Sequence, residues 1–430
     1  MSDRKPTLIF LIGRLNFYRL FGTIIDEALR RGYSVECWHE ASQPRVGSRD
    51  YLYPDPEKAP AFRHGVPSHR KHLSFPEVLA HCRELGVSTV FSLAGPDHYG
   101  DFAMPPGMRW ICLQHGMDVF ISNPLNSMIR ADAIMVMSPF WIDYALQLYR
   151  AKNPVEEASE AAFRAKCHVV GFPEADSFKS LEASALRAKF GVPPEKKVLL
   201  YLPWDKNVDF GPWAEVFSFP FRPHRILSRL LRNPSFLPYF FRGWHEYSIF
   251  KAIKAFCDRE GVLLIVKSRK KAMDGGFIRN GAHSYFLDLS DYPPTIVELI
   301  RISSLCVHYH SFATQELGAA GVPALCVHLD PFHAKERGFG PFTSLMADKA
   351  RNFFHWEGFS KVLTPPELFK LLKRASFPEI AGTGSPGAES YQDRYLGLTD
   401  GLSSSRLLDA LEKIPNATAV SAAAVDDVRP

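Results

Sequence analysis

Several common signatures are missing from this chain of 430 residues. The first apolar run is followed by GRLNFYRLFG, which lacks the dinucleotide pattern G-x-G-x-x-G and argues against a nicotinamide enzyme. No Walker A motif occurs, so a bound phosphate would have to be held by helix ends and basic side chains. The formal net charge is only +5, and no long basic run marks a nucleic-acid surface. We therefore expect no nucleic-acid partner.

The seven cysteines are scattered through apolar runs and form no C-x-x-C pair. This pattern predicts reduced, buried thiols, and we expect neither a metal nor another cofactor. The apolar run before Arg14 is only about seven residues long, which predicts a first strand rather than a signal peptide. No apolar stretch approaches the roughly 20 residues of a membrane span. We expect a cytoplasmic protein, either free or peripheral on the inner face of the cell membrane.

The first part of the chain alternates apolar runs with segments of helical spacing. Residues 7–12 form a continuous apolar run, typical of a strand buried on both faces of a parallel sheet. Residues 17–31 have helical spacing and end at Gly32. The same reasoning predicts strands at 33–38, 87–93, 109–114, 133–137 and 168–171, and helices at 76–85 and 139–149. This alternation predicts an α/β fold with a doubly wound sheet.

A second α/β unit is predicted after a linker. Its strands are expected at 197–203, 262–267, 284–287, 305–309 and 324–328. We therefore predict an N-terminal domain over 1–173, a linker over 174–196, a C-terminal domain over 197–380, a loop and helix over 381–415 and a disordered tail over 416–430.

Residues 207–250 depart from this alternation because aromatic side chains are dense there and five arginines accompany them. Aromatic and arginine side chains together suit a lipid headgroup boundary or a sugar phosphate. The segment is either an insertion that meets a membrane surface or an acceptor, or a helical excursion whose aromatics fill a local core.

Ligands of doubly wound sheets bind beyond the carboxyl ends of the strands. His115 follows such a strand and precedes Gly116, which permits close approach of the backbone. An imidazole there can act as a general base toward an acceptor hydroxyl, with Asp118 orienting it or acting instead. The alternative is a hydrogen-bonded structural histidine.

Other polar residues follow neighbouring strands of the predicted N-terminal sheet. Arg14 and Asn16 follow the first strand, and Asp97 and His98 follow the strand at 87–93. Because these positions share one sheet edge with His115, we count all four as candidates for the acceptor side of a cleft.

Residues 289–330 have the order strand, turn, helix, break and strand. The turn holds Ser311 and Thr314, and a helix is expected to open at Glu316. Backbone N–H groups and the helix dipole favour an anion at such a helix N-terminus. The Glu316 carboxylate can accept two hydrogen bonds from a ribose diol. The segment therefore suggests a nucleotide-diphosphate site, and His310, directly before the turn, is counted with it.

The sequence KSRKK after the strand at 262–267 is a compact cationic turn. Lys267 and Arg269, nearest the strand end, could neutralise a diphosphate leaving group. The alternative is a solvated basic loop.

Several of these segments, taken in order, resemble a known family. They are VVGFPEADSF (169–178), KKVLLYLPWD (196–205), LIVKSRK (264–270), LSDYPPTIVELIRIS (289–303) and HSFATQELGAAGVP (310–323). They are similar to GT-B glycosyltransferases, and most to the CDP-glycerol glycerophosphotransferases of teichoic-acid synthesis and related capsule and Kdo transferases. Gln114-His115-Gly116 matches the His-Gly that ends an N-domain strand in that family.

The resemblance implies a GT-B fold, with two Rossmann-like domains facing across a cleft and the donor held mainly by the C-terminal one. His115 would be the base, Ser311 and Thr314 would touch phosphate, and Glu316 would bind ribose. Where the family has Lys-x-His-Pro this chain has KSRK, so Arg269 would stand in for the histidine.

The activity implied is metal-independent transfer of a sugar or alditol-phosphate in polysaccharide biosynthesis of the cell envelope. The donor would be a nucleotide-sugar or CDP-alditol, and the acceptor a hydroxyl of a surface glycan or lipid-linked glycan. Two alternatives stay open. One is a nucleotide-sugar 2-epimerase, which shares the fold, and the other is a non-catalytic scaffold that binds glycan or lipid.

Overall fold

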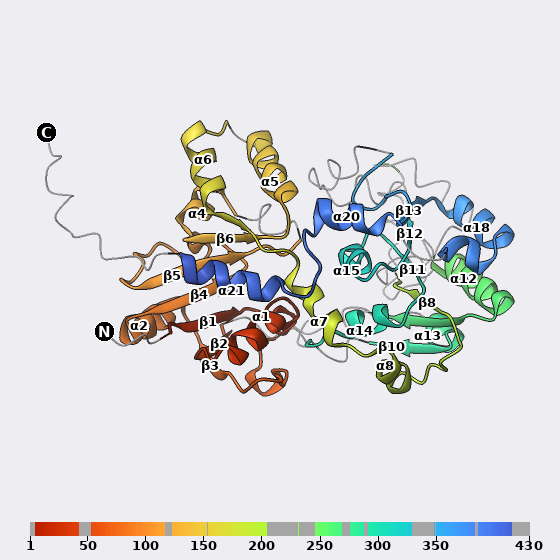
Figure 1. Ribbon diagram of the computed structural model, residues 1–430, viewed down its shortest axis with the longest axis horizontal. Helices are drawn as coiled ribbons and strands as arrows, with labels where there is room; N and C mark the ends of the chain where they lie inside the picture. The colour runs from red at the N-terminus through yellow and green to blue at the C-terminus, as the bar shows by residue number, and fades with distance from the viewer. Residues whose placement is uncertain are drawn as a thin grey trace, which may run out of the picture. The chain divides into compact units, whose positions relative to one another are not determined.

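The computed structural model describes residues 5–42, 53–116, 123–152, 154–203, 231, 246–268, 276–287, 291–328, 348, 350–382 and 386–414. These residues form two compact units (Figure 1). One unit takes in the described residues up to Lys179, Asp291–Pro293 and those from Arg394 onwards. The other takes in the described residues of Ser180–Ser290 and Pro294–Asp393.

The first unit is built on a seven-stranded parallel sheet with the order β3-β2-β1-β4-β5-β6-β7. Its strands are β1 (Thr7–Ile12), β2 (Val35–Glu40), β3 (Ser68–His72), β4 (Ser88–Ser92), β5 (Met108–Leu113), β6 (Ala133–Val136) and β7 (Cys167–Val169). The central strands β1, β4 and β5 are buried along their whole length. Burial on both faces explains the apolar run of β1 (TLIFLI), while β4 (STVFS) and β5 (MRWICL) also bury hydroxyl groups and an arginine.

Helices follow the strands of this sheet in the order expected for a doubly wound fold. They are η1 (Leu15–Phe17), α1 (Tyr18–Arg30), η3 (Pro56–Lys58), α2 (Phe75–Leu85), η4 (Pro96–Tyr99), α4 (Leu125–Arg130), α5 (Pro139–Lys152), α6 (Glu157–Lys166), η5 (Pro173–Asp176) and α7 (Ser177–Ser180). The α1 helix buries its apolar side chains against β1 and β2, in one core cluster with them.

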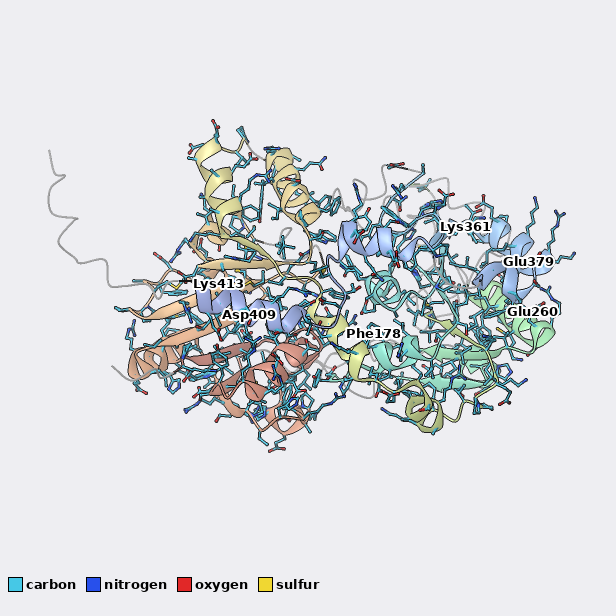
Figure 2. The ribbon with its side chains drawn as sticks, viewed as in Figure 1. Phe178, Glu260, Lys361, Glu379, Asp409 and Lys413 are labelled. Atoms are coloured by element: carbon cyan, nitrogen blue, oxygen red, sulfur yellow. The ribbon has the colours of Figure 1, made fainter. Side chains whose placement is uncertain are left out.

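The last helix, α21 (Ser403–Lys413), completes the core of the first unit. Its leucines 407, 408 and 411 belong to the same buried cluster as β1 and α1. The Arg109 guanidinium donates to the carbonyls of Leu411 and Ile414, both at 3.0 Å. In Figure 1 the blue α21 lies among the red and orange elements from the start of the chain, and Asp409, which pairs with Arg31, is labelled on it in Figure 2. The N-terminal sheet therefore needs the C-terminal helix.

The second unit contains a six-stranded parallel sheet with the order β10-β9-β8-β11-β12-β13. Its strands are β8 (Val198–Tyr201), β9 (Leu263–Lys267), β10 (Ser284–Phe286), β11 (Leu305–His308), β12 (Ala324–Val327) and β13 (Ser360–Leu363). Its helices are α8 (Ala183–Lys189), α12 (Glu246–Glu260), α13 (Gly276–Gly281), α14 (Thr295–Arg301), α15 (Ala313–Ala320), α18 (Pro365–Arg374) and α19 (Phe377–Ala381), and α20 (Ala388–Tyr395) runs into the first unit.

Helices α12 and α19 of this second unit meet at a polar contact. The Glu260 carboxylate accepts a hydrogen bond of 2.8 Å from the backbone N–H of Phe377, at the start of α19. Glu379 closes a capping box with Ser376 on the same helix, and both glutamates are labelled in Figure 2. Two acids thereby satisfy backbone N–H groups that the first helical turn leaves without partners.

The predicted α/β class and parallel sheets are confirmed, and the strand at 7–12 has the predicted bounds. Two edge strands were missed, because β3 (SHRKH) and β13 (SKVL) are not buried on both faces and carry few apolar residues. The helix expected to open at Glu316 begins at Ala313.

All seven cysteines are free thiols, six of them buried and Cys167 half-buried. The predicted tail at 416–430 and nearly all of the aromatic segment at 207–250 lie outside the described residues. No helix in the described part of the chain combines the length and apolar character needed to cross a bilayer.

A buried polar cluster joins α1, β2 and β3. The His39 Nδ1 lies 3.1 Å from the carbonyl of Pro54, and its Nε2 lies 2.9 Å from the Tyr18 hydroxyl. His69 Nδ1 lies 3.2 Å from His39 Nε2 and 3.3 Å from the Tyr18 hydroxyl. Burial lowers the pKa of His39 to about 4, with His69 adding to the effect, so the imidazole is neutral at neutral pH.

Candidate active site

The side chain of Gln114 links the turn that carries His115 to the backbone just after β6. Gln114 is buried at the end of β5, where its carboxamide oxygen accepts from the Met137 N–H at 2.9 Å. Its carboxamide nitrogen donates to the Gly116 carbonyl, also at 2.9 Å. Gly116 has φ 53°, in the left-handed region that favours glycine. The backbone on either side of His115 is thereby fixed at the carboxyl edge of the first sheet.

His115 lies against a buried carboxylate, that of Glu174. Glu174 belongs to η5, directly after β7, and its side chain is 7% exposed. Its Oε1 lies 3.7 Å from His115 Nδ1, which is an electrostatic contact longer than a hydrogen bond. Its Oε2 accepts a hydrogen bond of 2.9 Å from Nε of Arg19, on α1. A histidine, a carboxylate and a guanidinium from three different elements therefore meet at one place.

The electrostatics of Glu174 are decided by its two partners. Burial raises the pKa of its carboxyl group, but Arg19 and then His115 outweigh burial and bring the pKa below the ordinary value of 4.5. The carboxylate is thus ionised at neutral pH. The short helix η5, which carries Glu174, is held against α1 by Thr23, whose hydroxyl donates to the Pro173 carbonyl at 2.9 Å.

The sequence GFPEAD, residues 171–176, contacts both His115 and the last helix of the described chain. While Glu174 reaches His115, Asp176 caps the N-terminus of α21 by accepting from the N–H groups of Ser403 at 3.0 Å and Ser404 at 2.6 Å. Gly171 has φ 90°, and a Cβ there would lie 2.6 Å from the Leu398 carbonyl oxygen. The motif therefore joins the candidate base to the last helix of the chain.

The other first-unit candidates are placed differently. Arg14 and Asn16 are exposed in the turn after β1. Asp97, on η4, forms an ion pair with Arg130, and its N–H donates to Ser127 Oγ at 3.2 Å. The Asp97 carboxylate thus has a structural partner.

The last two candidates of the first unit are His98 and Asp118. His98 is exposed, with its ring 5.1 Å from that of the neighbouring Tyr99. Asp118 lies outside the described residues.

In the second unit, the predicted donor turn lies between β11 and α15. The Ser311 carbonyl accepts from the N–H of Thr314 at 3.1 Å and from its hydroxyl at 2.7 Å. The Ala313 N–H donates to Ser311 Oγ at 3.2 Å, and the Gln315 N–H donates to the Phe312 carbonyl at 2.9 Å. These N–H groups already have acceptors in the turn, so a phosphate would have to compete with them. Glu316 is buried in the first turn of α15.

His310 is held in a strained backbone conformation just before this turn. Its φ of 31° is positive, which is uncommon for a residue other than glycine and is a feature that clusters at functional sites. Its N–H donates to the Cys326 sulfur at 3.2 Å, and its buried ring meets those of Phe354 and His328 edge-on at 4.8 and 5.1 Å. Lys267 is buried at the end of β9, while Arg269 lies outside the described residues.

Comparisons with solved structures identify the architecture. The structure is similar to a histidine-to-alanine variant of the wall teichoic acid polymerase TagF, with a TM-score of 0.60, 13% identity, and coverage of 96% of this chain and 89% of that one. A histidine-to-asparagine variant of TagF matches with a TM-score of 0.58, 15% identity and the same coverage. A putative UDP-N-acetylglucosamine 2-epimerase from Listeria monocytogenes matches at 0.52 and 11% identity, over 95% of this chain and 96% of that one.

The chain has the GT-B fold. No known family model matches the sequence, and no curated protein sequence matches it significantly. The likeness to TagF confirms, at the level of fold, the resemblance to CDP-glycerol glycerophosphotransferases that the sequence motifs carry. Because identities of 11–15% accompany both a polymerase and an epimerase, the fold leaves the activity to be argued from the site.

Proposed function

We propose that this protein transfers a sugar or an alditol-phosphate from a nucleotide-activated donor to a hydroxyl group of a surface-glycan or lipid-linked acceptor. The observation that carries the proposal is His115, held beside the ionised, buried carboxylate of Glu174 at the carboxyl edge of the first sheet. A histidine at this edge, with one ring nitrogen facing a carboxylate, has the arrangement of a general base.

In the proposed reaction, His115 takes the proton of the acceptor hydroxyl on Nε2 while the acceptor oxygen attacks the donor. If a sugar is transferred, the oxygen bonds to the anomeric carbon, and a nucleoside diphosphate leaves from a CDP-, UDP- or GDP-linked donor or a nucleoside monophosphate from a CMP-linked one. If an alditol-phosphate is transferred, the oxygen bonds to the distal phosphorus and a nucleoside monophosphate leaves. The proton then passes from His115 to solvent.

We assign the donor to the second unit. Ser311 and Thr314 would contact its phosphates, Glu316 its ribose, and Lys267 and Arg269 the charge that develops on the leaving group. His310 is included because its strained backbone lies directly before this turn. One TagF structure was soaked with CDPG, which favours including a CDP-linked donor in the assay.

The first test is turnover with CMP-, CDP-, UDP- and GDP-linked donors, with and without glycan acceptors. For the active donor, His115→Ala should lower turnover by about 10²-fold or more, as expected for loss of a general base, while calorimetry gives unchanged donor affinity. His168→Ala is the matched control, because His168 is a half-buried histidine of the same sheet, on β7. Unchanged turnover in His115→Ala would refute the assignment. Turnover should also survive EDTA, since no metal is invoked.

The epimerase alternative is retained because an epimerase shares the fold. It predicts that the donor is converted without any acceptor. A scaffold without activity would bind none of the donors. Membrane association through 207–250 is a separate proposal, tested by vesicle co-sedimentation of Arg225→Ala and Arg229→Ala variants, which should lose salt-sensitive binding to anionic vesicles.

A further inference from the structure

The environment of His115 assigns roles to two residues, Glu174 and Arg19, to which the family resemblance gave none. Glu174 and Arg19 come from η5 and α1, so neither is near His115 in the sequence. The geometry nevertheless forms a chain of three groups, from Arg19 Nε to Glu174 Oε2 at 2.9 Å and from Glu174 Oε1 to His115 Nδ1 at 3.7 Å.

The two edges of the His115 ring face different surroundings. The Nδ1 atom is buried, and among the described residues it has no hydrogen-bond partner closer than the Glu174 carboxylate. The side chain as a whole is 34% exposed, so other atoms of the residue reach the surface of the unit. A carboxylate beside Nδ1 favours a proton there, because an N–H is attracted to the negative charge and a lone pair is repelled. That tautomer leaves the lone pair on Nε2 for an incoming hydroxyl.

Arg19 fixes the other end of the chain. The Glu174 carboxylate is buried, and a buried carboxylate without a cation tends to take up a proton. The Arg19 guanidinium prevents this by donating to one carboxylate oxygen, which leaves the other oxygen free to face His115. Thr23, on the same helix as Arg19, donates its hydroxyl to the carbonyl of Pro173, the residue before Glu174. Helix α1 therefore sets the position of the glutamate.

We infer that Glu174 is a positioning residue, held by Arg19, which sets the His115 tautomer and stabilises the imidazolium that forms when the acceptor is deprotonated. This role rests on the proposed function of His115. The contact at 3.7 Å tightens to a hydrogen bond as positive charge develops on the ring, a change that is common between free enzymes and their substrate complexes.

The inference is tested with Glu174→Gln, which keeps the size of the side chain and removes its charge. Its kcat should fall by at least about 10-fold, and by up to the roughly 10⁴-fold lost when an amide replaces the carboxylate that orients a triad histidine, while KM changes by less than about twofold. Asp176→Asn is the matched control, because Asp176 is a half-buried carboxylate of the same short helix that faces α21 instead of His115. Its kcat should stay within about twofold of the wild type.

Two readouts separate positioning from a merely structural role. In the His115→Ala background, Glu174→Gln should cause no further loss of kcat, because the glutamate acts only through the histidine. Proton–nitrogen NMR of the His115 ring should give the Nδ1–H tautomer in the wild type and a shift toward Nε2–H in Glu174→Gln.

The outcomes also separate this inference from the proposed function. A normal kcat in Glu174→Gln beside an inactive His115→Ala would overturn the positioning role and leave the transferase proposal standing. An equal loss of kcat in both backgrounds, or an unchanged tautomer, would also overturn it. Full activity of His115→Ala would remove the proposed function and this inference together.

Discussion

Replacing Arg19 by methionine removes the cation that keeps the buried Glu174 carboxylate ionised. Loss of one partner from a fully buried ion pair costs about 3–5 kcal/mol, and a hydrogen bond to a charged group contributes about 1.5–3 kcal/mol. Glu174 is 7% exposed but Arg19 is 30% exposed, so water screens the pair in part. We therefore expect Arg19→Met to destabilise the first unit by about 2 kcal/mol at pH 7, or about 4–8 °C in Tm.

The sign of the pH dependence follows from the pKa of Glu174. In the wild type this pKa lies below 4.5, so the carboxylate contributes stability above pH 4.5 that is lost as the pH falls through the folded value. Without Arg19, burial raises the pKa and the glutamate destabilises the unit at neutral pH. A protonated carboxyl needs no cation, and so the difference between variant and wild type should be smaller at pH 4 than at pH 7, and should vanish only below the folded pKa of the wild-type glutamate.

Urea unfolding at pH 7 and at pH 4, monitored through hydrogen exchange of the amides in α1 and β5, measures the loss of stability in the first unit and its change with pH. Arg14→Met is the matched control, because Arg14 is an exposed arginine of the neighbouring turn, and no ion pair of its guanidinium is found among the described residues. Its stability should stay within about 0.5 kcal/mol of the wild type. A loss in Arg19→Met that is the same at both pH values, or that Arg14→Met reproduces, would refute the reasoning.

Three further changes test the fold around the site. Asp176→Ala should cost about 1–2 kcal/mol in urea unfolding, because the start of α21 loses its cap. Gly171→Ala should cost more than Gly32→Ala, since both glycines have positive φ but only a Cβ at 171 meets a carbonyl oxygen, at 2.6 Å; equal losses in Tm would contradict this. The lowered pKa of His39, about 4, means that stability falls as the pH drops from 6.5 to 4, by up to about 3 kcal/mol, and His39→Asn should flatten that slope.

Much of the architecture could be predicted from apolar runs, because strands buried on both faces are mostly apolar. The runs at 7–12 and 305–309 correspond to β1 and β11 within a residue. The method fails at sheet edges, where β3 has only a histidine fully buried and no apolar residue at all. Edge strands are recognised by their neighbours, and neighbours are not visible in a local pattern.

The candidate site could be predicted from the sequence only in part, for the same reason. His115 could be singled out because it directly follows a predicted strand, and in the structure it lies just beyond the end of β5. Glu174 lies within the segment 169–178 that resembles the family, but no local pattern shows that its carboxylate contacts His115, which is 174 − 115 = 59 positions earlier in the chain. Arg19 lay within a predicted helix, and Arg14, in the turn before it, was chosen instead. Contacts between strand ends depend on strand order, which the sequence alone leaves open.

The position of α21 has a consequence for how the protein is made. The last strand of the first sheet is synthesised 403 − 169 = 234 residues before α21 begins, which is about 12–47 s at ordinary elongation rates. During that time the apolar surface that leucines 407, 408 and 411 later cover is exposed to water and to chaperones. A premature stop codon near the 3′ end of the message would therefore harm the part of the protein that was translated first.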